Sequence, residues 1–477
     1  MQPTVITESD SLRAFLAYLN PEFKLPSRRK LGDDIKTMGN KVKNEIVQLV
    51  SKQDYLATTA DSWSSHHRAF VGSTVSWLDK DTLDRKTAVL GIKEVKESQT
   101  GQFLAKSLCQ LNEDFNISSK VLSTTTDNGS NYVSAFVHYG KDHENLVEPG
   151  AVVEDNPDVE LAEHPRIISV EEALGQAHTD EALQAEISLP EHQRCAAHTI
   201  NLLASEDVSQ VKQWNHGPRN PFRRAAAKAQ ALWNAQGRRS IVANQIKEAI
   251  GKKFKTPGAT RWNSSYDSYK QLSQVLDNPE SRRKINCIMS KVRPAPIPPF
   301  LDEDIAVIKE YVKVMAPVSQ ALDKMQSDQQ GYMGNYLPNL MVLERELTKL
   351  SSDNTIKYAQ NLVTTLLKAP DHHGRGKKGF TERFRPMFTD MNKLMATAFH
   401  PRFRLKTVKV SLNRTNPELY TQVRNRMVSD LVALIRSTEE DRRNVDYRFQ
   451  SQPTYSRLQS TTGNTEQPFN DEFDFIY

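Results

Sequence analysis

The chain has 477 residues, of which 25% are charged, and a formal net charge of +5. This length is enough for about three domains, or for one domain with a large insertion, so a core can form without disulfide staples. Its three cysteines, at 109, 195 and 287, are too scattered for a disulfide framework and fit a reducing compartment. The sequence also lacks a secretory signal pattern and any run of about eighteen apolar residues, which predicts a soluble intracellular protein without a membrane partner.

Charge is segregated along the chain. Residues 141–191 are strongly acidic, and a basic region follows between Arg219 and Arg261. Two interpretations of the basic region remain open: a phosphate-binding surface, or a solvated face partly neutralised by the acidic neighbour. The basic residues that we single out as candidates for DNA contact are Arg223, Arg224, Lys252 and Lys253.

Residues 8–53 carry the periodicity of helices. Leu12, Phe15, Leu16 and Leu19 are spaced for one helical face, and Pro21 ends that segment. A second helix is predicted over Lys36–Val50. These two segments make a helical start to the chain.

The pattern then changes to strands. Segments 54–61, 69–78 and 87–95 are separated by tight polar turns, which predicts an antiparallel meander. Residues 102–115 form an amphipathic helix, and residues 120–127 return as a fourth strand. Because the helix is a crossover connection, we expect the fourth strand to lie beside the first and parallel to it.

This placement brings two aspartates together. Asp61 ends the run LATTAD and Asp127 ends LSTTTD, so the two carboxylates are expected on adjacent strands about 5 Å apart. Carboxylates at that separation repel unless a cation bridges them, and pairs of divalent metals held in this way serve phosphoryl transfer. The alternative is that both aspartates only end strands and begin turns.

Five segments are expected in chain order. Their boundaries follow from changes in composition and in hydrophobic periodicity along the chain. They are an N-terminal helical segment at 1–54, a sheet-containing core at 55–140, an acidic flexible insertion at 141–192 with one helix near Val170–Gln184, a helical insertion with return to the core at 193–436, and a disordered tail at 437–477.

Five motifs in a fixed order resemble a known family. They are TTADSWSS, TTTDNGSNYVSAF, RCAAHTINLL, ATRWNSSYDSYKQL and MATAFHPRFRLK. The order is similar to that of hAT (hobo/Activator-type) transposases and of the zinc finger BED domain proteins domesticated from them. The resemblance implies an α/β fold with an RNase H-like mixed sheet, interrupted by a large, mainly helical insertion, in a nuclear protein.

The same resemblance assigns roles to the aspartates. Active family members use a triad of two aspartates and one glutamate with two Mg²⁺ ions, and Asp61 and Asp127 match the first two carboxylates. The third belongs to a Ser-Glu-Arg-x-Phe-Ser motif that this sequence lacks, and Glu382 and Glu439 are poor substitutes by context. The BED finger and the C-terminal dimerisation region of the family are not found either, so we expect no structural zinc and doubt dimerisation.

Two functions follow from the resemblance. The first is a transposase-derived, catalytically inactive nuclear protein that binds DNA or protein partners and regulates transcription. The second is an active transposase or nuclease that cuts DNA with Mg²⁺ at Asp61 and Asp127. A purely structural interaction module is a third hypothesis, and it predicts no affinity for DNA.

Further candidate residues have two interpretations each. Cys195 and His198 form a Cys-x2-His pair, which is either structural or, with His192, part of a metal site that lacks its fourth ligand. Arg261 and Trp262 match an Arg-Trp motif suited to phosphate contact and base stacking, or to core packing. Asn128 and Asn131 are expected to cap the helix after Asp127.

Overall fold

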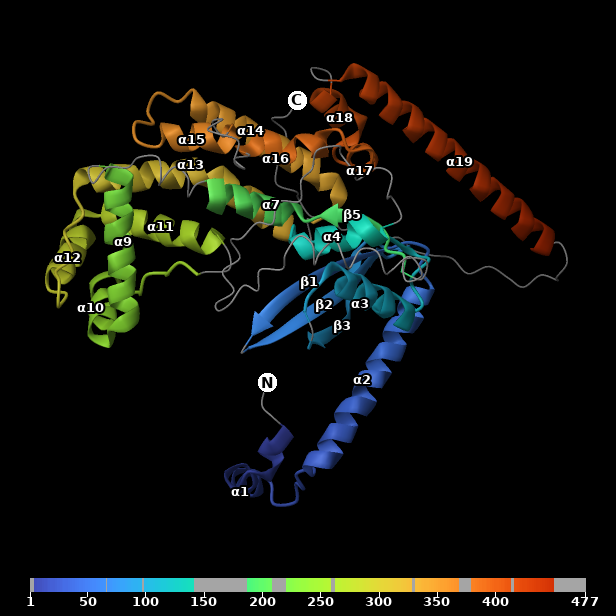
Figure 1. Cartoon of the computed structure of the whole chain (residues 1–477), viewed down its shortest axis with the longest axis horizontal. Helices are drawn as coiled ribbons and strands as arrows, with labels where there is room; N and C mark the ends of the chain where they lie inside the picture. Colours follow the sequence, from blue (N-terminus) through green and yellow to red (C-terminus); the bar gives the residue numbers. More distant parts are fainter. Residues whose placement is uncertain are drawn as a thin grey trace, which may run out of the picture. The chain divides into compact units, whose positions relative to one another are not determined.

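The computed structural model describes residues 4–65, 67–96, 98–140, 187–207, 220–258, 262–327, 331–368, 379–412 and 416–449. The chain divides into two compact units, Met1–Cys195 and Ala196–Tyr477. Figure 1 shows the sheet in unit 1, while the described elements of unit 2 are helical. Within the described ranges, no helix is both long enough and apolar enough to cross a membrane.

Unit 1 begins with helices. They are η1 (Thr4–Glu8), α1 (Asp10–Leu19) and α2 (Arg28–Ser51). The second long helix starts well before the predicted Lys36, because Ser27 caps it by accepting a hydrogen bond from the Lys30 amide. Its first turns contain mainly charged residues, so apolar periodicity could not reveal them.

A five-stranded mixed sheet follows, in the order β3-β2-β1-β4-β5. Its strands are β1 (Leu56–Ser65), β2 (Arg68–Leu78), β3 (Arg85–Val95), β4 (Val121–Thr126) and β5 (Glu191–Arg194). The pairs β1–β2 and β2–β3 are antiparallel, whereas β4 is parallel to β1 and β5 is parallel to β4. The predicted meander and the parallel fourth strand are therefore confirmed. The short edge strand β5 was not predicted.

Two helices cover one face of this sheet. They are α3 (Gly101–Asp114) and α4 (Ser130–Tyr139). Their buried residues pack against Ala60 and Val71 in one cluster, and the end of α2 joins a second cluster through Val50. Because side chains alternate along a strand, Thr59 and Asp61 lie on the other face of the sheet.

Unit 2 is built from helices around two apolar clusters, one formed by α9–α13 and the other by α14 and α17–α19. Its elements are α7 (Ala196–Leu202), η2 (Leu203–Asp207), α9 (Pro221–Arg238), α10 (Ser240–Ile250), α11 (Trp262–Asp277), α12 (Pro279–Ser290), α13 (Asp302–Gln326), η3 (Met333–Asn335), α14 (Tyr336–Ser351), α15 (Gln360–Leu367), α16 (Gly379–Phe384), η4 (Arg385–Phe388), α17 (Met391–Phe399), α18 (Arg404–Leu412) and α19 (Pro417–Phe449).

The last helix differs from the prediction. α19 continues to Phe449, beyond the boundary expected at residue 436. The polar sequence after 436 indicated a tail, but its glutamate and arginine residues are also good helix formers. The helix predicted near Val170–Gln184, within the acidic insertion, lies outside the described residues.

Candidate functional site

The parallel pair β1–β4 brings the two candidate aspartates to one end of the sheet. Thr59 is paired with Thr125, so the same register places Asp127, two residues further, beside Asp61. Asp61 lies within β1 opposite Gly72 of β2 and is exposed, whereas Asp127 follows β4 directly and is half-buried. The expected adjacent, parallel placement of β1 and β4 is thereby confirmed, Asp127 follows directly after β4, and the separation of about 5 Å between the two carboxylates stays a prediction.

The backbone around Asp127 is held by short-range hydrogen bonds. The Gly129 amide donates to Asp127 Oδ1 at 3.1 Å, and the Thr126 hydroxyl donates to the Asp127 carbonyl oxygen at 2.8 Å. A Cβ atom at position 129 would lie only 3.0 Å from that Oδ1. Glycine is therefore the residue that lets the turn close onto the carboxylate.

The capping prediction at this turn was wrong. Gly129 is the N-cap of α4, so the residue at the cap position has no side chain that could accept a cap hydrogen bond. Asn128 precedes the cap and Asn131 lies inside the first turn of the helix. The Asp127 carboxylate takes the place predicted for the asparagines, because it binds the Gly129 amide at the entrance to α4.

His192 holds Thr126 from the neighbouring strand. Its Nε2 lies 2.9 Å from Thr126 Oγ1, and its ring stacks on Phe136 with centroids 4.3 Å apart. Since the single hydroxyl proton of Thr126 is donated to the Asp127 carbonyl, Nε2–H of His192 must be the donor in their contact. Burial, assisted by Arg194, lowers the pKa of His192 to about 4, so the ring is neutral near pH 7.

This geometry corrects the sequence interpretation of His192. The sequence groups it with Cys195 and His198 as a possible third metal ligand, whereas it belongs to β5 and its ring contacts Thr126. Cys195 is half-buried and forms no disulfide within the described ranges, and its amide donates to the Thr126 carbonyl at 2.8 Å. His198 is half-buried on α7. A structural role for the Cys-x2-His pair and the absence of zinc both remain predictions.

Tyr132 of α4 is a buried tyrosine whose pKa is raised. Its side chain is 2% exposed. Burial raises the pKa of Tyr132, the side chain of Ser62 opposes that shift, and the charges of Asp127 and Asp61 raise it further. No local signal in the sequence identifies Tyr132 or His192, because both contacts depend on the tertiary fold.

The described residues do not complete a two-metal centre. Such a centre usually needs at least three carboxylate or imidazole ligands, and no group of three His, Cys, Asp or Glu side chains gathers in the described parts of the chain. Glu382 lies in the first turn of α16, in unit 2. Magnesium binding by Asp61 and Asp127 therefore stays a prediction, and no reaction step is assigned to it.

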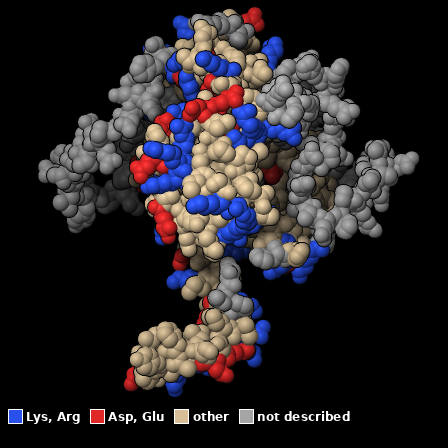
Figure 2. All heavy atoms as spheres, turned by 90° about the vertical axis from the view of Figure 1, so that its left-hand side faces the viewer, with Lys and Arg blue, Asp and Glu red and all other residues tan. Residues whose placement is uncertain are grey.

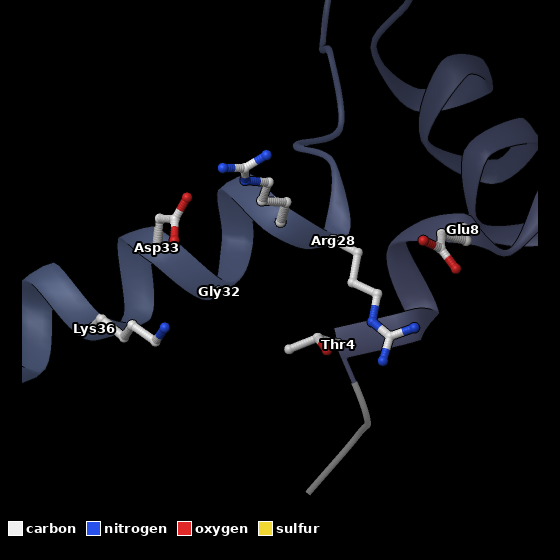
Figure 3. A pocket seen from close by; sticks show the side chains of 7 residues that line it. Thr4, Glu8, Arg28, Gly32, Asp33 and Lys36 are labelled. Atoms are coloured by element: carbon white, nitrogen blue, oxygen red, sulfur yellow. The ribbon is translucent and has the colours of Figure 1, made fainter.

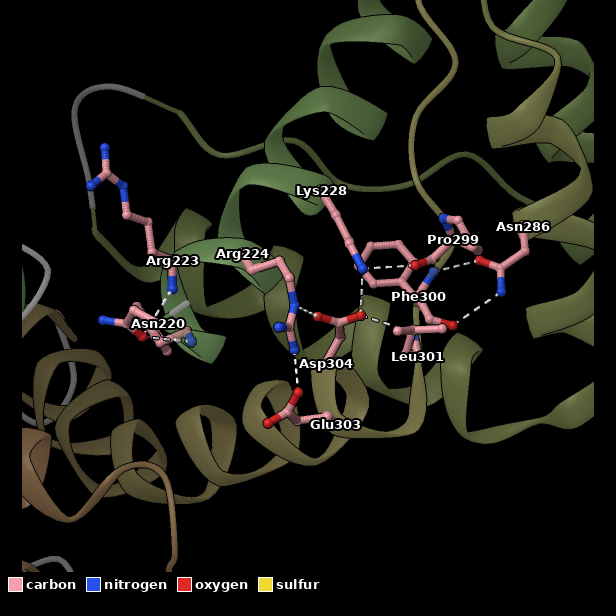
Figure 4. A network of polar contacts seen from close by, with 11 residues as sticks. Asn220, Arg223, Arg224, Lys228, Asn286, Pro299, Phe300, Leu301, Glu303 and Asp304 are labelled. Atoms are coloured by element: carbon pink, nitrogen blue, oxygen red, sulfur yellow. Dashed lines mark hydrogen bonds and ion pairs between the residues drawn. The ribbon is translucent and has the colours of Figure 1, made fainter. Parts of the chain in front are cut away.

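In unit 2, two adjacent candidate arginines have different surroundings. Arg223 is exposed at the start of α9. Arg224 points into a polar network, where its guanidinium pairs with Glu303 and with Asp304 at 3.1 Å (Figure 4). Lys228 Nζ reaches the other oxygen of Asp304 at 2.6 Å, and Asp304 is fully buried. The guanidinium of Arg224 thus forms ion pairs within unit 2, whereas the side chain of Arg223 is exposed to solvent.

Lys252 and Lys253 lie on a firmly held segment. After the left-handed Gly251 at the end of α10, Gln236 binds both the amide and the carbonyl of Phe254. Gln271 likewise accepts from the Lys255 amide and donates to the Lys253 carbonyl. Both glutamines are buried, while the two lysines are exposed. The backbone is therefore fixed and the two positive charges project from it.

Further cations accompany these lysines on or directly after α9, α10 and α12, of which α10 packs against both α9 and α12. Figure 2 looks onto the side of the molecule where α10 and α12 lie in Figure 1, and shows several groups of Lys and Arg with some Asp and Glu between them. We call the exposed cations of this region that have no ion-pair partner within the described ranges the basic surface. They include Arg238, Arg239, Lys247, Lys252, Lys253, Arg283, Lys291 and Arg293.

The remaining candidates receive less support. Arg261 lies outside the described residues, and Trp262 is the first residue of α11, with a side chain outside the description. An open hollow exists in unit 1, where Arg28 extends from the start of α2 toward Thr4 and Glu8 of η1 (Figure 3). Its lining mixes both charge signs, at the end of α2 far from Val50 and the sheet, so it adds nothing to the carboxylate site.

Comparison with known proteins points to one class. Residues 59–147 match the family model of the ZBED1 RNase-like domain, a segment that contains both Asp61 and Asp127. A stretch of 108 residues, 22% of this chain, is 29% identical to tpeD of Talaromyces stipitatus, which is named as a candidate transcriptional regulator. The match covers 13% of tpeD, so the chain corresponds to a small part of that relative. These similarities support a relationship to ZBED-type, hAT-derived proteins.

Proposed function

We propose that this chain is a hAT-like, transposase-derived nuclear protein that binds DNA, regulates transcription and does not cut DNA. In this proposal an RNase H-like sheet in unit 1, interrupted by a large helical insertion, is the scaffold. The helices α9–α12 of the insertion provide the DNA contacts. Protein partners are a second part of the same role.

The basic surface is the observation that carries the proposal. Its cations are exposed and have no carboxylate partner among the described residues, whereas Lys255, Lys284 and Lys309 of the same unit do have one. Unpaired cations on a fixed backbone attract phosphates, because their binding releases counterions from DNA. The hydrogen bonds from Gln236 and Gln271 supply that fixed backbone beside Lys252 and Lys253.

The non-catalytic part of the proposal rests on the carboxylates. Asp61 and Asp127 supply two of the three ligands that the resemblance requires, and the described residues supply no third neighbour. Loss of one ligand weakens metal binding and removes charge stabilisation in the transition state, at a cost of several kcal/mol, or about a thousandfold or more in rate. The similarity to tpeD supports a role in transcription.

The test measures binding of the full chain to labelled duplex DNA over a range of salt concentrations. We expect Lys252→Ala/Lys253→Ala to reduce the salt slope of log K by about 2 and the affinity roughly 30-fold near 0.15 M salt, since each phosphate contact contributes about 0.9 to the slope. The matched control is Lys284→Ala/Lys309→Ala, which removes the same charge from residues paired with Glu280 and Asp277. An equal loss in both variants would mean that only net charge matters, and absence of binding would favour the interaction module.

The catalytic alternative is tested in the same preparation. Nicked and hairpin DNA are incubated with the chain and Mg²⁺ or Mn²⁺, and we expect no strand cleavage. Cleavage that Asp61→Asn and Asp127→Asn both abolish would establish the active transposase or nuclease instead.

A further inference from the structure

The helix α10 of unit 2 has two faces of different character. One face packs in the apolar cluster of α9–α13 through Val242 and Ile246. The residues of the opposite face are all exposed and are spaced i, i+3, i+4 and i+7, so they lie on one side of the helix. They are Ile241, Asn244, Gln245 and Glu248. Because the packed face anchors the helix, the exposed face has a fixed orientation within unit 2.

The two amides of this face are available to a ligand. Neither Asn244 nor Gln245 forms a hydrogen bond with another residue in the described part of the chain, although each can donate and accept. The buried amides nearby differ, because Gln236 and Gln271 are bound to backbone groups. The buried amides therefore hold the fold, whereas the exposed ones do not.

Cations of the basic surface lie at both ends of α10. Arg238 and Arg239 directly precede the helix, and Lys252 and Lys253 follow it after Gly251. The helix has 11 residues, so it is about 16 Å long. This length suits the major groove of B-form DNA, which is about 12 Å wide and has phosphates along both edges. The arrangement thus matches polar side chains to the groove floor and cations to its edges.

We propose that α10 enters the major groove of duplex DNA and reads bases through Asn244 and Gln245. Amides of this kind bind adenine in a bidentate manner, donating to N7 and accepting from the N6 amino group. Ile241, at 71% exposure, is placed to contact a thymine methyl group, and Glu248 can accept from the amino group of cytosine. This inference rests on the proposed DNA binding and adds a sequence preference to it.

The surface selects DNA over other partners. Double-stranded RNA does not admit the helix, because its major groove is deep and narrow. A protein partner would need an apolar centre, and Ile241 is the one apolar residue of the four on this face. The unpaired cations on either side instead complement a polyanion.

The test begins with selection of preferred sequences by the full chain from duplex DNA with a randomised centre. We expect the preferred sequence to contain adenine. Asn244→Ala/Gln245→Ala should lower the affinity for it at least about 5-fold, since one bidentate pair discriminates roughly 5- to 150-fold. The affinity for unrelated duplex DNA and the salt slope should stay unchanged. Gln230→Ala/Asn234→Ala is the matched control, because these exposed amides of α9 bind each other at 3.0 Å.

The lysine variant separates base contacts from phosphate contacts. Lys252→Ala/Lys253→Ala should weaken binding to preferred and unrelated duplexes by the same factor, because phosphates carry no sequence information. The amide variant should instead change the ratio of the two affinities. Circular dichroism checks that every variant keeps its helix content.

A modified base then locates the contact in the groove. Replacing adenine by 7-deazaadenine removes the N7 acceptor from the major groove, so it should weaken binding of the unmodified chain but not of Asn244→Ala/Gln245→Ala. Salt-dependent binding without sequence preference, or with a preference that the amide variant and the modified base leave unchanged, would overturn this inference and leave the proposed function intact. Absence of binding to any duplex would refute both.

Discussion

The sheet end in unit 1 and the start of α13 in unit 2 use carboxylates in opposite ways. At the sheet end, the interior polar contacts are neutral: Thr58 binds Thr124 at 2.7 Å, and Thr126 binds His192. Asp61 and Asp127 stay outside these contacts and reach solvent. In unit 2 the carboxylate of Asp304 is fully buried and bound by Lys228 and Arg224. An accessible charge is available for a ligand, whereas a buried, paired charge is already committed to the fold.

This difference also separates Arg223 from Arg224. Neighbouring arginines in a basic stretch are equivalent in a sequence, but only the first is exposed without a carboxylate partner among the described residues. A change at Arg224 would disturb Glu303 and Asp304 together with any DNA contact. Arg223 is therefore the better position at which to measure a DNA contact.

The largest effect is expected at the buried ion pair. Asp304→Ala leaves Lys228, whose side chain is 8% exposed, without its partner, and should cost about 3–5 kcal/mol of unfolding free energy. Chemical denaturation of the full chain, followed by circular dichroism, measures this loss. Asp302→Ala is the control, because that side chain is 93% exposed and its loss should cost less than about 1 kcal/mol. Equal losses of unfolding free energy in the two variants would mean that burial of the carboxylate does not decide its contribution to stability.

A double variant sharpens the same comparison. Asp304→Leu/Lys228→Met removes both charges, so it should recover much of the stability that Asp304→Ala loses. Burial alone would raise the pKa of Asp304, but hydrogen bonds from Lys228, the Leu301 amide and Arg224 outweigh it and lower that pKa. The stabilisation by Asp304 is therefore present above the unfolded pKa of about 3.9 and is lost as the pH falls below it.

Much of the carboxylate site followed from the sequence, and the reasons are local. The alternation in β1–β3, the amphipathic α3 and the repeated threonine-rich run before each aspartate are patterns within single segments. They were sufficient to place β4 beside β1 and the two aspartates at the same end of the sheet. The observed register, with Thr59 opposite Thr125, agrees with that derivation.

The support around the site could not be predicted, because it comes from distant parts of the chain. β5 has four mostly polar residues, EHQR, without apolar alternation. The contact between Thr126 and His192 joins residues 66 positions apart across the acidic insertion. In the basic region, composition could not tell that Arg224 is paired with Glu303 and Asp304 while Lys252 and Lys253 are exposed.

A smaller effect is expected at His192. His192→Ala removes the donor to Thr126 and the stack on Phe136, and should cost about 1–3 kcal/mol of unfolding free energy. His192→Gln keeps an amide donor near the position of Nε2, so it should cost less. Both losses are measured by denaturation at pH 7.5, where the ring is neutral.

The pH dependence separates the charge of His192 from its shape. Because folding lowers its pKa from about 6.5 to about 4, protonation favours the unfolded chain, and stability should fall as the pH drops from about 6.5 to 4. His192→Gln should show a shallower fall over this interval than the unmodified chain. Identical slopes in the two proteins would mean that folding does not lower the pKa of His192.

The smallest effect is expected at the two site aspartates, and it completes the contrast with Asp304. Asp61 is exposed, so Asp61→Asn should change the unfolding free energy by no more than about 0.5 kcal/mol. Asp127→Ala should cost about 1 kcal/mol, because the Gly129 amide at the entrance to α4 loses its acceptor, as at other helix caps. Asp127→Asn keeps an oxygen acceptor and should lie between these values. Neither carboxylate is then needed to hold the sheet together, so both are open to a ligand without loss of stability. A loss at Asp61 as large as that at Asp304 would reverse this conclusion and make the pair a structural element.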